Sequence, residues 1–225
     1  MGLKIAIDGP SGAGKSTIAK TISKEFGFVY LDTGAMYRSF AWYALSVGAN
    51  CENIEDMLAL LGTFDLKVEY IDSKQQLIVN GKNITDLVRT PEISTAASQV
   101  AAIPQVRQKM VTIQKKIANN SNVVMDGRDI GTCVLPDADL KIFLIASVSD
   151  RAKRRYEEMI EKGDNSQTYD QVKADMIQRD SHDSARSHSP LKQADDAILV
   201  DTTGYEVWQT ADKILGIVRS NLCLK

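Results

Sequence analysis

A glycine-rich loop near the start of the chain carries the residues with the clearest chemistry. Residues 9–16 read Gly-Pro-Ser-Gly-Ala-Gly-Lys-Ser and fit the pattern G-x-x-x-x-G-K-[ST], in which backbone N–H groups and a helix N-terminus surround phosphate oxygens. In such a loop Lys15 supplies a positive charge to the β and γ phosphates, and the Ser16 hydroxyl ligates Mg²⁺. The sequence therefore predicts a nucleoside triphosphate site with Mg²⁺. Its expected residues are Gly9, Pro10, Ser11, Gly12, Ala13, Gly14, Lys15, Ser16 and Thr17.

Arginines at loop and helix-start positions form a second group. A guanidinium binds phosphate through paired hydrogen bonds, and a protein that brings two phosphorylated molecules end to end needs several such groups to screen their repulsion. Each arginine alone could equally form a surface ion pair. Together with a phosphate loop, the group indicates phosphoryl transfer. Its members are Arg38, Arg107, Arg128, Arg151, Arg154, Arg155, Arg179 and Arg186.

Composition narrows the class of protein. With 225 residues, a net charge of -2 and 44% hydrophobic residues, the chain is typical of a folded globular protein rather than a disordered chain or a general nucleic-acid binder. The sequence has no guanine-reading N-K-x-D motif, which a switch GTPase needs.

Cysteine spacing and apolar segments bear on the cellular location. Cys51, Cys133 and Cys223 are far apart and odd in number, so neither a disulfide framework nor a zinc site is expected. No stretch approaches the ~20 apolar residues of a membrane span, and the N-terminus lacks a signal-peptide core. We therefore expect a cytoplasmic protein without a membrane partner.

The elements that must position these residues alternate between short apolar runs and helical patterns, which is typical of a parallel sheet with crossover helices. Pro104 and the pairs Thr168 with Gln171 and Thr203 with Glu206 predict helix starts, the two pairs as capping boxes. Trp42 and Trp208 lie on apolar helical faces, which predicts core positions. Five strands are expected, at residues 4–8, 28–31, 123–125, 140–145 and 197–200.

One segment departs from this alternation. Residues 64–70 alternate apolar and charged side chains, and residues 76–79 lead into Asn80-Gly81, a strong signal for a two-residue hairpin turn. Residues 63–90 therefore predict a small antiparallel sheet inserted between strands of the core. A second irregular stretch, residues 163–167, is polar and follows a basic helix.

Six motifs along the chain resemble those of the bacterial cytidylate kinases, within the nucleoside monophosphate (NMP) kinase group. They are IDGPSGAGKST at 7–17, LDTGAMYR at 31–38, AASQVAAIPQVR at 96–107, DGRDIGT at 126–132, RAKRR at 151–155 and RDSHDSAR at 179–186. The resemblance covers nearly the whole chain. It implies an α/β P-loop NTPase fold: one kinase domain with a core at 1–32, 98–150 and 168–225, an NMP-binding insertion at about 33–97, and a lid at about 151–167.

The resemblance implies transfer of the γ-phosphoryl group of ATP to CMP, with dCMP also accepted, by a monomer that uses Mg²⁺. Catalytic roles fall to Lys15, Arg128, Arg154, Arg155 and Arg186, with Arg154 and Arg155 closing over the phosphates from the lid. Asp126 ends an apolar strand and could order the waters of Mg²⁺, or it could instead cap a helix or pair with an arginine.

The CMP site implied by the resemblance divides by the part of the nucleotide that is bound. Arg38, Arg128 and Arg186 hold the phosphate, Ser98, Arg107 and Asp129 read the cytosine ring, and Arg179 and Asp183 contact the ribose. Thr33 replaces a serine found in many family members and keeps its hydroxyl.

Base chemistry agrees with these roles. Cytosine offers an amino donor at N4, which a carboxylate such as Asp129 accepts, whereas uracil would place a carbonyl against it. Two alternatives remain open from the residues alone. One is a kinase with a different acceptor (UMP, AMP or a small alcohol such as shikimate), and the other is an ATP-binding switch that drives a partner interaction.

Overall fold

The computed structural model describes residues 2–72, 74–186 and 188–224, and the chain divides into two compact units. One consists of Leu3–Phe28 and Asn122–Lys225 and is called the loop unit here, because it contains the phosphate loop. The other consists of Met1–Gly2 and Val29–Ser121 and is called the hairpin unit.

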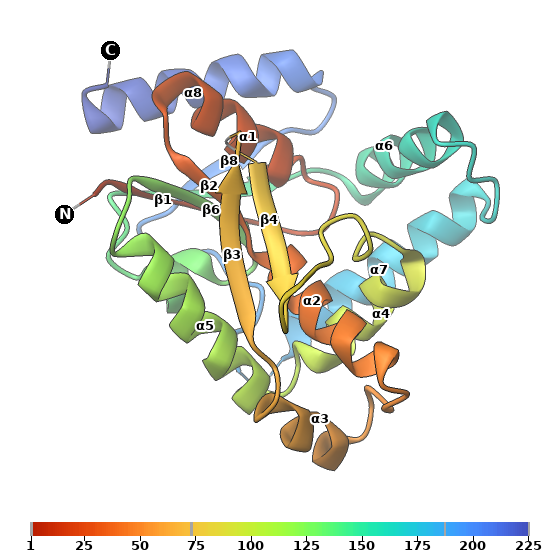
Figure 1. The fold of residues 1–225 in the computed structure, drawn as a ribbon. Helices are drawn as coiled ribbons and strands as arrows, with labels where there is room; N and C mark the ends of the chain where they lie inside the picture. Colours follow the sequence, from red (N-terminus) through yellow and green to blue (C-terminus); the bar gives the residue numbers. More distant parts are fainter. Residues whose placement is uncertain (1, 73, 187, 225) are drawn as a thin grey trace. The chain divides into compact units, whose positions relative to one another are not determined.

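The larger sheet has five strands in the order β2-β6-β1-β7-β8, and helices flank it (Figure 1). The central strand is β1, in which Ile5 lies level with Val124 of β6 and with Leu140 of β7, both in parallel. Ile5, Ala6 and Ile7 are fully buried, as expected for a strand covered on both faces. The predicted five-stranded parallel sheet is confirmed. Its strands are β1 (Lys4–Asp8), β2 (Val29–Asp32), β6 (Val123–Gly127), β7 (Leu140–Ile145) and β8 (Ile198–Asp201).

Helices connect and flank the strands along the chain. They are α1 (Lys15–Phe26), α2 (Thr33–Ser46), α3 (Ile54–Leu61), α4 (Pro91–Val100), α5 (Pro104–Ala118), α6 (Val148–Glu161), α7 (Tyr169–Ala185) and α8 (Val207–Leu222), with a short π-helical turn η1 (Ile130–Val134) after β6.

The hairpin unit holds the predicted small antiparallel sheet, with strand order β3-β4-β5. Asn80 and Gly81 form the turn after β4 with φ of 48° and 81°, the left-handed values that a two-residue hairpin turn requires. The Asn80 side chain also accepts a hydrogen bond of 2.8 Å from the N–H of Asp65. Its strands are β3 (Leu66–Ile71), β4 (Lys74–Val79) and β5 (Lys82–Asn83).

Two of the three predicted helix starts are confirmed. Pro104 opens α5, and Thr168 with Gln171 forms a capping box before α7. The third is wrong: α8 follows Glu206, whose N–H donates to the side chain of Gln209. Gly204 has a left-handed φ of 71° directly after Thr203, which prevents a helix from starting there.

Trp208 contradicts its predicted place in the core, because it is 69% exposed. The buried residues of α8 are Thr210, Ile214 and Val218, which recur every four positions, and Trp208 lies off that stripe.

All three cysteines are free thiols. Among the residues that the structure describes, no helix combines the length and the apolar character needed to cross a membrane.

Candidate active site

The phosphate loop joins the end of β1 to the start of α1, as the sequence predicts. Gly9 has φ 145°, and a Cβ atom there would lie 2.0 Å from the carbonyl oxygen of Leu144 on β7, so a side chain does not fit. Gly14, directly before α1, has a left-handed φ of 91°. These conformations bring the loop onto the N-terminus of α1, where N–H groups and the helix dipole favour an anion.

Lys15 is the first residue of α1 and is only 5% exposed. Its Nζ donates a hydrogen bond of 2.6 Å to the carbonyl oxygen of Pro10 within the loop. Burial, together with the nearby charge of Arg128, lowers the pKa of Lys15 well below its ordinary value, while Asp126 and Asp8 act in the opposite direction. A phosphate bound in the loop would add negative charge beside this ammonium group and raise its pKa.

Ser16 and Asp126 are the residues suited to a metal ion. The Ser16 hydroxyl donates to a carboxylate oxygen of Asp126 at 2.7 Å, so the two oxygens lie side by side next to the loop. Oxygen ligands suit Mg²⁺, which keeps waters and takes its remaining ligands from substrate phosphates. The described part of the chain contains no group of three His, Cys, Asp or Glu residues that could hold a metal by itself. The donor set therefore fits a phosphate-bound Mg²⁺ rather than a resident metal.

Asp8 closes β1 immediately before the loop and is 4% exposed. Its two carboxylate oxygens accept hydrogen bonds from the backbone N–H groups of Ile130, at 2.8 Å, and Gly131, at 2.7 Å. Burial raises the pKa of Asp8 to about 6, and the two N–H groups limit that rise.

A carboxylate on α7 joins two of the predicted phosphate-binding arginines. Asp183 accepts from Arg128 at 2.8 Å and lies 2.6 Å from a nitrogen of Arg186, and all three side chains are largely buried. Burial alone would raise the pKa of Asp183, but the charges of Arg128 and Arg186 outweigh it and hold that pKa below its ordinary value. Arg179, one turn earlier on α7, adds to this field. The structure thus brings four predicted site residues together.

The three arginines of α6 have different partners. Arg151 is 3% exposed, donates to the Ser11 carbonyl of the phosphate loop at 3.0 Å, and pairs with Asp180 of α7 at 2.7 Å. Arg154 donates to the carbonyls of residues 202 and 205, at 2.9 and 3.1 Å, in the segment between β8 and α8. Arg155 makes an exposed pair with Glu158 at 3.5 Å. Of the three, Arg151 is the one bonded to the loop, and the sequence motif gave it no particular role.

Helices α6 and α7 form a hairpin in the loop unit (Figure 1). A Cβ atom at Gly12 would lie 3.0 Å from the terminal methyl carbon of Met176 on α7 and 3.2 Å from the Cβ of Arg151 on α6. Both helices therefore pack directly against the phosphate loop.

Four predicted CMP-binding residues lie in the hairpin unit. Thr33, the first residue of α2, is buried, and Ser98 is partly buried on α4. Arg38 pairs with Asp32 at 3.0 Å. Arg107 is 5% exposed, donates to the Ala101 carbonyl at 3.2 Å, and lies over the ring of Tyr37 with 5.5 Å between guanidinium carbon and ring centre.

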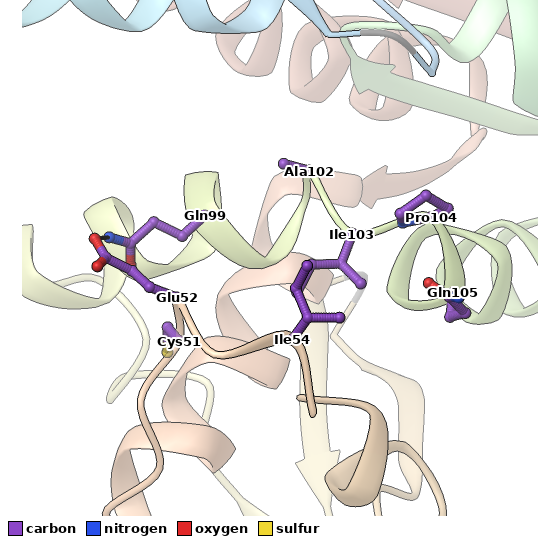
Figure 2. A pocket seen from close by; sticks show the side chains of 8 residues that line it. All are labelled: Cys51, Glu52, Ile54, Gln99, Ala102, Ile103, Pro104 and Gln105. Carbon is purple, nitrogen blue, oxygen red and sulfur yellow. Dashed lines mark hydrogen bonds between the residues drawn. The ribbon is translucent and has the colours of Figure 1, made fainter. Parts of the chain in front are cut away.

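A cavity of about 450 Å³ opens in the hairpin unit between the segment before α3 and the junction of α4 with α5 (Figure 2). Most of its wall is apolar, and a hydrogen bond of 2.8 Å from Gln99 to Glu52 lies at one side. None of the predicted site residues lines this cavity. Its lining residues are Cys51, Glu52, Ile54, Gln99, Ala102, Ile103, Pro104 and Gln105.

The fold and the loop together define the class: a five-stranded parallel sheet with a G-x-x-x-x-G-K-S loop after its central strand is a P-loop nucleotide-binding fold. The model of the cytidylate kinase family matches residues 5–220, and the chain belongs to that family.

Relatives of known function agree with this assignment. A cytidylate kinase from Streptococcus pneumoniae is 49% identical over 213 residues, covering 94% of this chain and 95% of the relative. Another from Oceanobacillus iheyensis is 47% identical over 213 residues, covering 95% and 92%.

Two solved structures share the fold at low sequence identity. An uncharacterized protein from Eubacterium ventriosum has a TM-score of 0.53 at 12% identity, covering 97% of this chain and 99% of its own. A gluconokinase from Sinorhizobium meliloti has a TM-score of 0.50 at 12% identity, covering 97% and 93%. At this identity the likeness concerns the fold alone.

The sequence does not predict the contacts of two buried residues at the site, Asp8 and Arg151. Asp8 was assigned to a strand, although a carboxylate that ends an apolar strand beside a phosphate loop is itself a signal. Arg151 was grouped with the other arginines, and nothing in a local motif distinguishes the arginine that reaches the loop from its neighbours on α6. Both residues make contacts far along the chain, which spacing does not reveal.

Proposed function

We propose that this protein transfers the γ-phosphoryl group of ATP to CMP, and also to dCMP, giving CDP or dCDP and ADP. The observation that carries the proposal is the family match over residues 5–220, which includes an intact phosphate loop and the paired arginines around Asp183. Curated relatives of nearly equal length bear the name cytidylate kinase.

The reaction needs charge stabilisation more than proton transfer. The attacking oxygen belongs to the acceptor phosphate and is already anionic at neutral pH, so no general base is required. Lys15 and the loop N–H groups would hold the triphosphate, while Arg128 and Arg186 would neutralise charge on the transferring group. Asp183 would keep these two guanidinium groups in place before the substrate binds, which lowers the cost of ordering them.

The acceptor is assigned by residue role. The CMP phosphate would be bound by Arg38, Arg128 and Arg186, and the ribose would be contacted by Arg179 and Asp183. Ser98, Arg107 and Asp129 would read the base, with the Asp129 carboxylate accepting from the cytosine N4 amino group. The Thr33 hydroxyl would add a further contact to CMP.

Closure over the substrates would be the task of residues 151–167, with Arg154 and Arg155 as the lid arginines. In this proposal residues 1–32, 98–150 and 168–225 are the core and residues 33–97 are the NMP-binding insertion. Exclusion of water by closure is what a kinase needs to avoid hydrolysing ATP.

Mg²⁺ would be held by Ser16 directly and by Asp126 through water, and it supplies charge neutralisation on the triphosphate. We propose that the protein works as a cytoplasmic monomer on small molecules, without nucleic acid or membrane partners. The resemblance to the cytidylate kinases implies the monomer, and the free cysteines and the net charge of -2 support the location and the lack of a nucleic-acid partner.

An ADP-release assay across acceptors tests the proposal. We expect turnover with CMP and dCMP, weaker turnover with UMP, and negligible ADP release without an acceptor. Robust turnover with AMP, UMP or shikimate and none with CMP would reassign the acceptor. ATP turnover that is independent of any monophosphate would instead favour the alternative of an ATP-binding switch that drives a partner interaction.

Lys15→Ala tests the phosphate loop within the same assay. Because Lys15 acts on the transferring phosphoryl group, we expect turnover to fall by at least about 100-fold with little change in folding. Lys20→Ala, an exposed lysine on the same helix, is the matched control and should retain activity. Near-normal turnover of the Lys15 variant would remove that lysine from the mechanism.

A further inference from the structure

The hydrogen bonds of Asp8 tie together two segments that are far apart in sequence. Asp8 lies between the last apolar residue of β1 and the first glycine of the phosphate loop, and its partner Ile130 lies 122 positions later. Both carboxylate oxygens are used, one for the N–H of Ile130 and one for the N–H of Gly131. Among the described residues, its hydrogen-bond donors are these two backbone N–H groups, and burying a carboxylate costs free energy that such bonds must offset.

Two of the predicted CMP-binding residues, Arg128 and Asp129, lie between two points at which the backbone is held in place. Asp8 lies level with Gly127, the last residue of β6, in the parallel pairing of β1 with β6. The chain then passes through Arg128 and Asp129 and returns to the Asp8 side chain at Ile130. A segment of two residues is therefore held at one end by the backbone of β1 and at the other by the Asp8 carboxylate.

The turn that follows explains why a carboxylate is needed at that point. In η1, the Asp129 carbonyl accepts from Cys133 at 2.9 Å and from Val134 at 3.3 Å, so the turn begins at Asp129. The first N–H groups of a helical turn find no acceptor within it. Those N–H groups belong to Ile130 and Gly131, and Asp8 satisfies both.

Gly131 lies close to both the Asp8 carboxylate and the Lys141 side chain. A Cβ atom at Gly131 would lie 3.4 Å from an Asp8 oxygen and 3.2 Å from the Lys141 side chain, so this position is closely packed. Asp129 itself is only 5% exposed, so its carboxylate is closely surrounded by the protein. A shift of the turn would carry the Asp129 carboxylate with it.

We infer that Asp8 is a positioning residue for base recognition, an inference that rests on the proposed function. Its carboxylate fixes the start of η1 and thereby sets the direction in which Asp129 meets the amino group of the acceptor base. Asp8 does not touch the substrate in this scheme. Because it also borders Gly9, it places the base-reading turn in a fixed relation to the phosphate loop.

The test is the base selectivity of Asp8→Asn. An amide offers one acceptor oxygen, and its NH₂ group opposes the second backbone N–H, so the turn loses one anchor. We expect the ratio of kcat/KM for CMP over that for UMP to fall by about tenfold or more, while KM for ATP changes by less than about threefold. Asp129→Asn is the positive control and should lower the same ratio.

Asp139→Asn is the matched negative control. The exposed Asp139 side chain accepts a hydrogen bond of 2.7 Å from the N–H of Lys4, at the other end of the same strand. The substitution therefore removes a carboxylate charge away from the site, while the amide oxygen can still accept that single bond. The selectivity ratio should be unchanged in this variant. Asp8→Ser is a second variant for the case in which Asp8→Asn folds poorly, since its hydroxyl can accept only one of the two N–H groups.

The selectivity ratio does not depend on the fraction of folded enzyme, because both substrates are measured on one sample. An equal loss for CMP and UMP in the Asp8 variants would assign Asp8 a structural role only and overturn the inference. An unchanged ratio would also overturn it. Failure of the wild-type protein to phosphorylate CMP would instead refute the proposed function, so the two failures are distinguishable.

Discussion

Asp8 and Asp183 are both buried carboxylates in the loop unit, but different groups stabilise their negative charges. Asp183 is 2% exposed and lies between the guanidinium groups of Arg128 and Arg186. Asp8 is 4% exposed and is held by two backbone N–H groups, with no ion pair among the described residues. The pKa of Asp183 is lowered, whereas that of Asp8 is raised to about 6.

The difference shows what each carboxylate does for the site. Asp183 balances two positive charges that would otherwise repel each other, so it allows two guanidinium groups to lie close together in a largely buried cluster. Asp8 makes no ion pair among the described residues, and its two hydrogen bonds fix the direction of a backbone segment. Removing Asp183 should therefore change charge and stability together, while removing Asp8 should change geometry more than stability. Variants at both positions, and at two less buried carboxylates, test this contrast.

The largest effect is expected for Asp183→Asn. The substitution leaves Arg128 and Arg186 buried without their counter-charge, which costs about 3–5 kcal/mol when one partner of a buried pair is removed. We expect a marked loss of unfolding free energy in denaturant titration and a fall in kcat/KM for CMP of at least about 100-fold. Asp212→Asn, an exposed carboxylate on α8, should change neither. A stability loss below about 1 kcal/mol would show that the two arginines do not need Asp183.

The pH dependence of the same variant sharpens this result. A depressed folded-state pKa gives a contribution that is present above the unfolded-state value of 3.8 and is lost as the pH falls below it. The wild-type protein should therefore lose more stability than Asp183→Asn on acidification below about pH 4.

Asp8 should have a smaller effect on the pH dependence of the unfolding free energy, and its sign should be opposite to that of Asp183. The folded state holds the Asp8 proton more tightly than the unfolded state, with a pKa of about 6 against 3.8, so its ionisation costs stability as the pH rises through that interval. Relative to Asp8→Asn, the wild-type protein should lose on the order of 2–3 kcal/mol of unfolding free energy between pH 4 and pH 7. Parallel stability curves for the two proteins would contradict the raised pKa.

Asp32 accepts both a backbone N–H and guanidinium groups, but its carboxylate is more exposed than that of Asp183, so its effect should be smaller still. One of its carboxylate oxygens accepts from the N–H of Ala35 at 2.8 Å as a helix cap, and the other accepts from Arg38 at 3.0 Å and from Arg89 at 3.3 Å. Asparagine keeps the cap and removes the charge. We expect Asp32→Asn to lower the unfolding free energy by about 1 kcal/mol and to raise KM for CMP several-fold, measured by denaturant titration and steady-state kinetics. Asp32→Ala, which also removes the cap, should cost about 1 kcal/mol more.

The smallest effect is expected at an exposed pair. Glu25 lies 2.5 Å from a nitrogen of Arg219, with the two side chains 45% and 43% exposed. Because solvent and salt screen such a pair, Glu25→Gln should change the unfolding free energy by less than about 0.5 kcal/mol and leave turnover unchanged. A loss comparable to that of Asp183→Asn would mean that burial does not govern the strength of these pairs.

Local patterns were sufficient for much of the fold and for part of the site. The apolar runs predicted all five strands, Asn80-Gly81 predicted its hairpin, and the spacing of Gly9, Gly14 and Lys15 predicted the phosphate loop, because each depends on residues that are neighbours in sequence. The helix start at Thr203 failed because Gly204 takes a left-handed conformation that the motif did not reveal.

The contacts that position the site were not predictable in the same way. The bond from Arg151 to the Ser11 carbonyl spans 140 residues, and the bonds of Asp8 span 122 and 123. Such bonds form because the sheet brings distant segments together, and no period in the sequence records them. The individual roles assigned to the site residues from the family motifs remain predictions that the variants above can test.

The central place of β1 in the sheet has a consequence for how the protein is made. β1 leaves the ribosome well before its two neighbours, β6 and β7, which begin at residues 123 and 140. At a synthesis rate of about 5–20 residues per second, these partner strands are made several seconds after the apolar segment around Ile5. Pairing between strands so far apart in sequence is also slow. The nascent chain should therefore acquire its phosphate loop late in synthesis, and its N-terminal strand is the segment most in need of protection by chaperones until then.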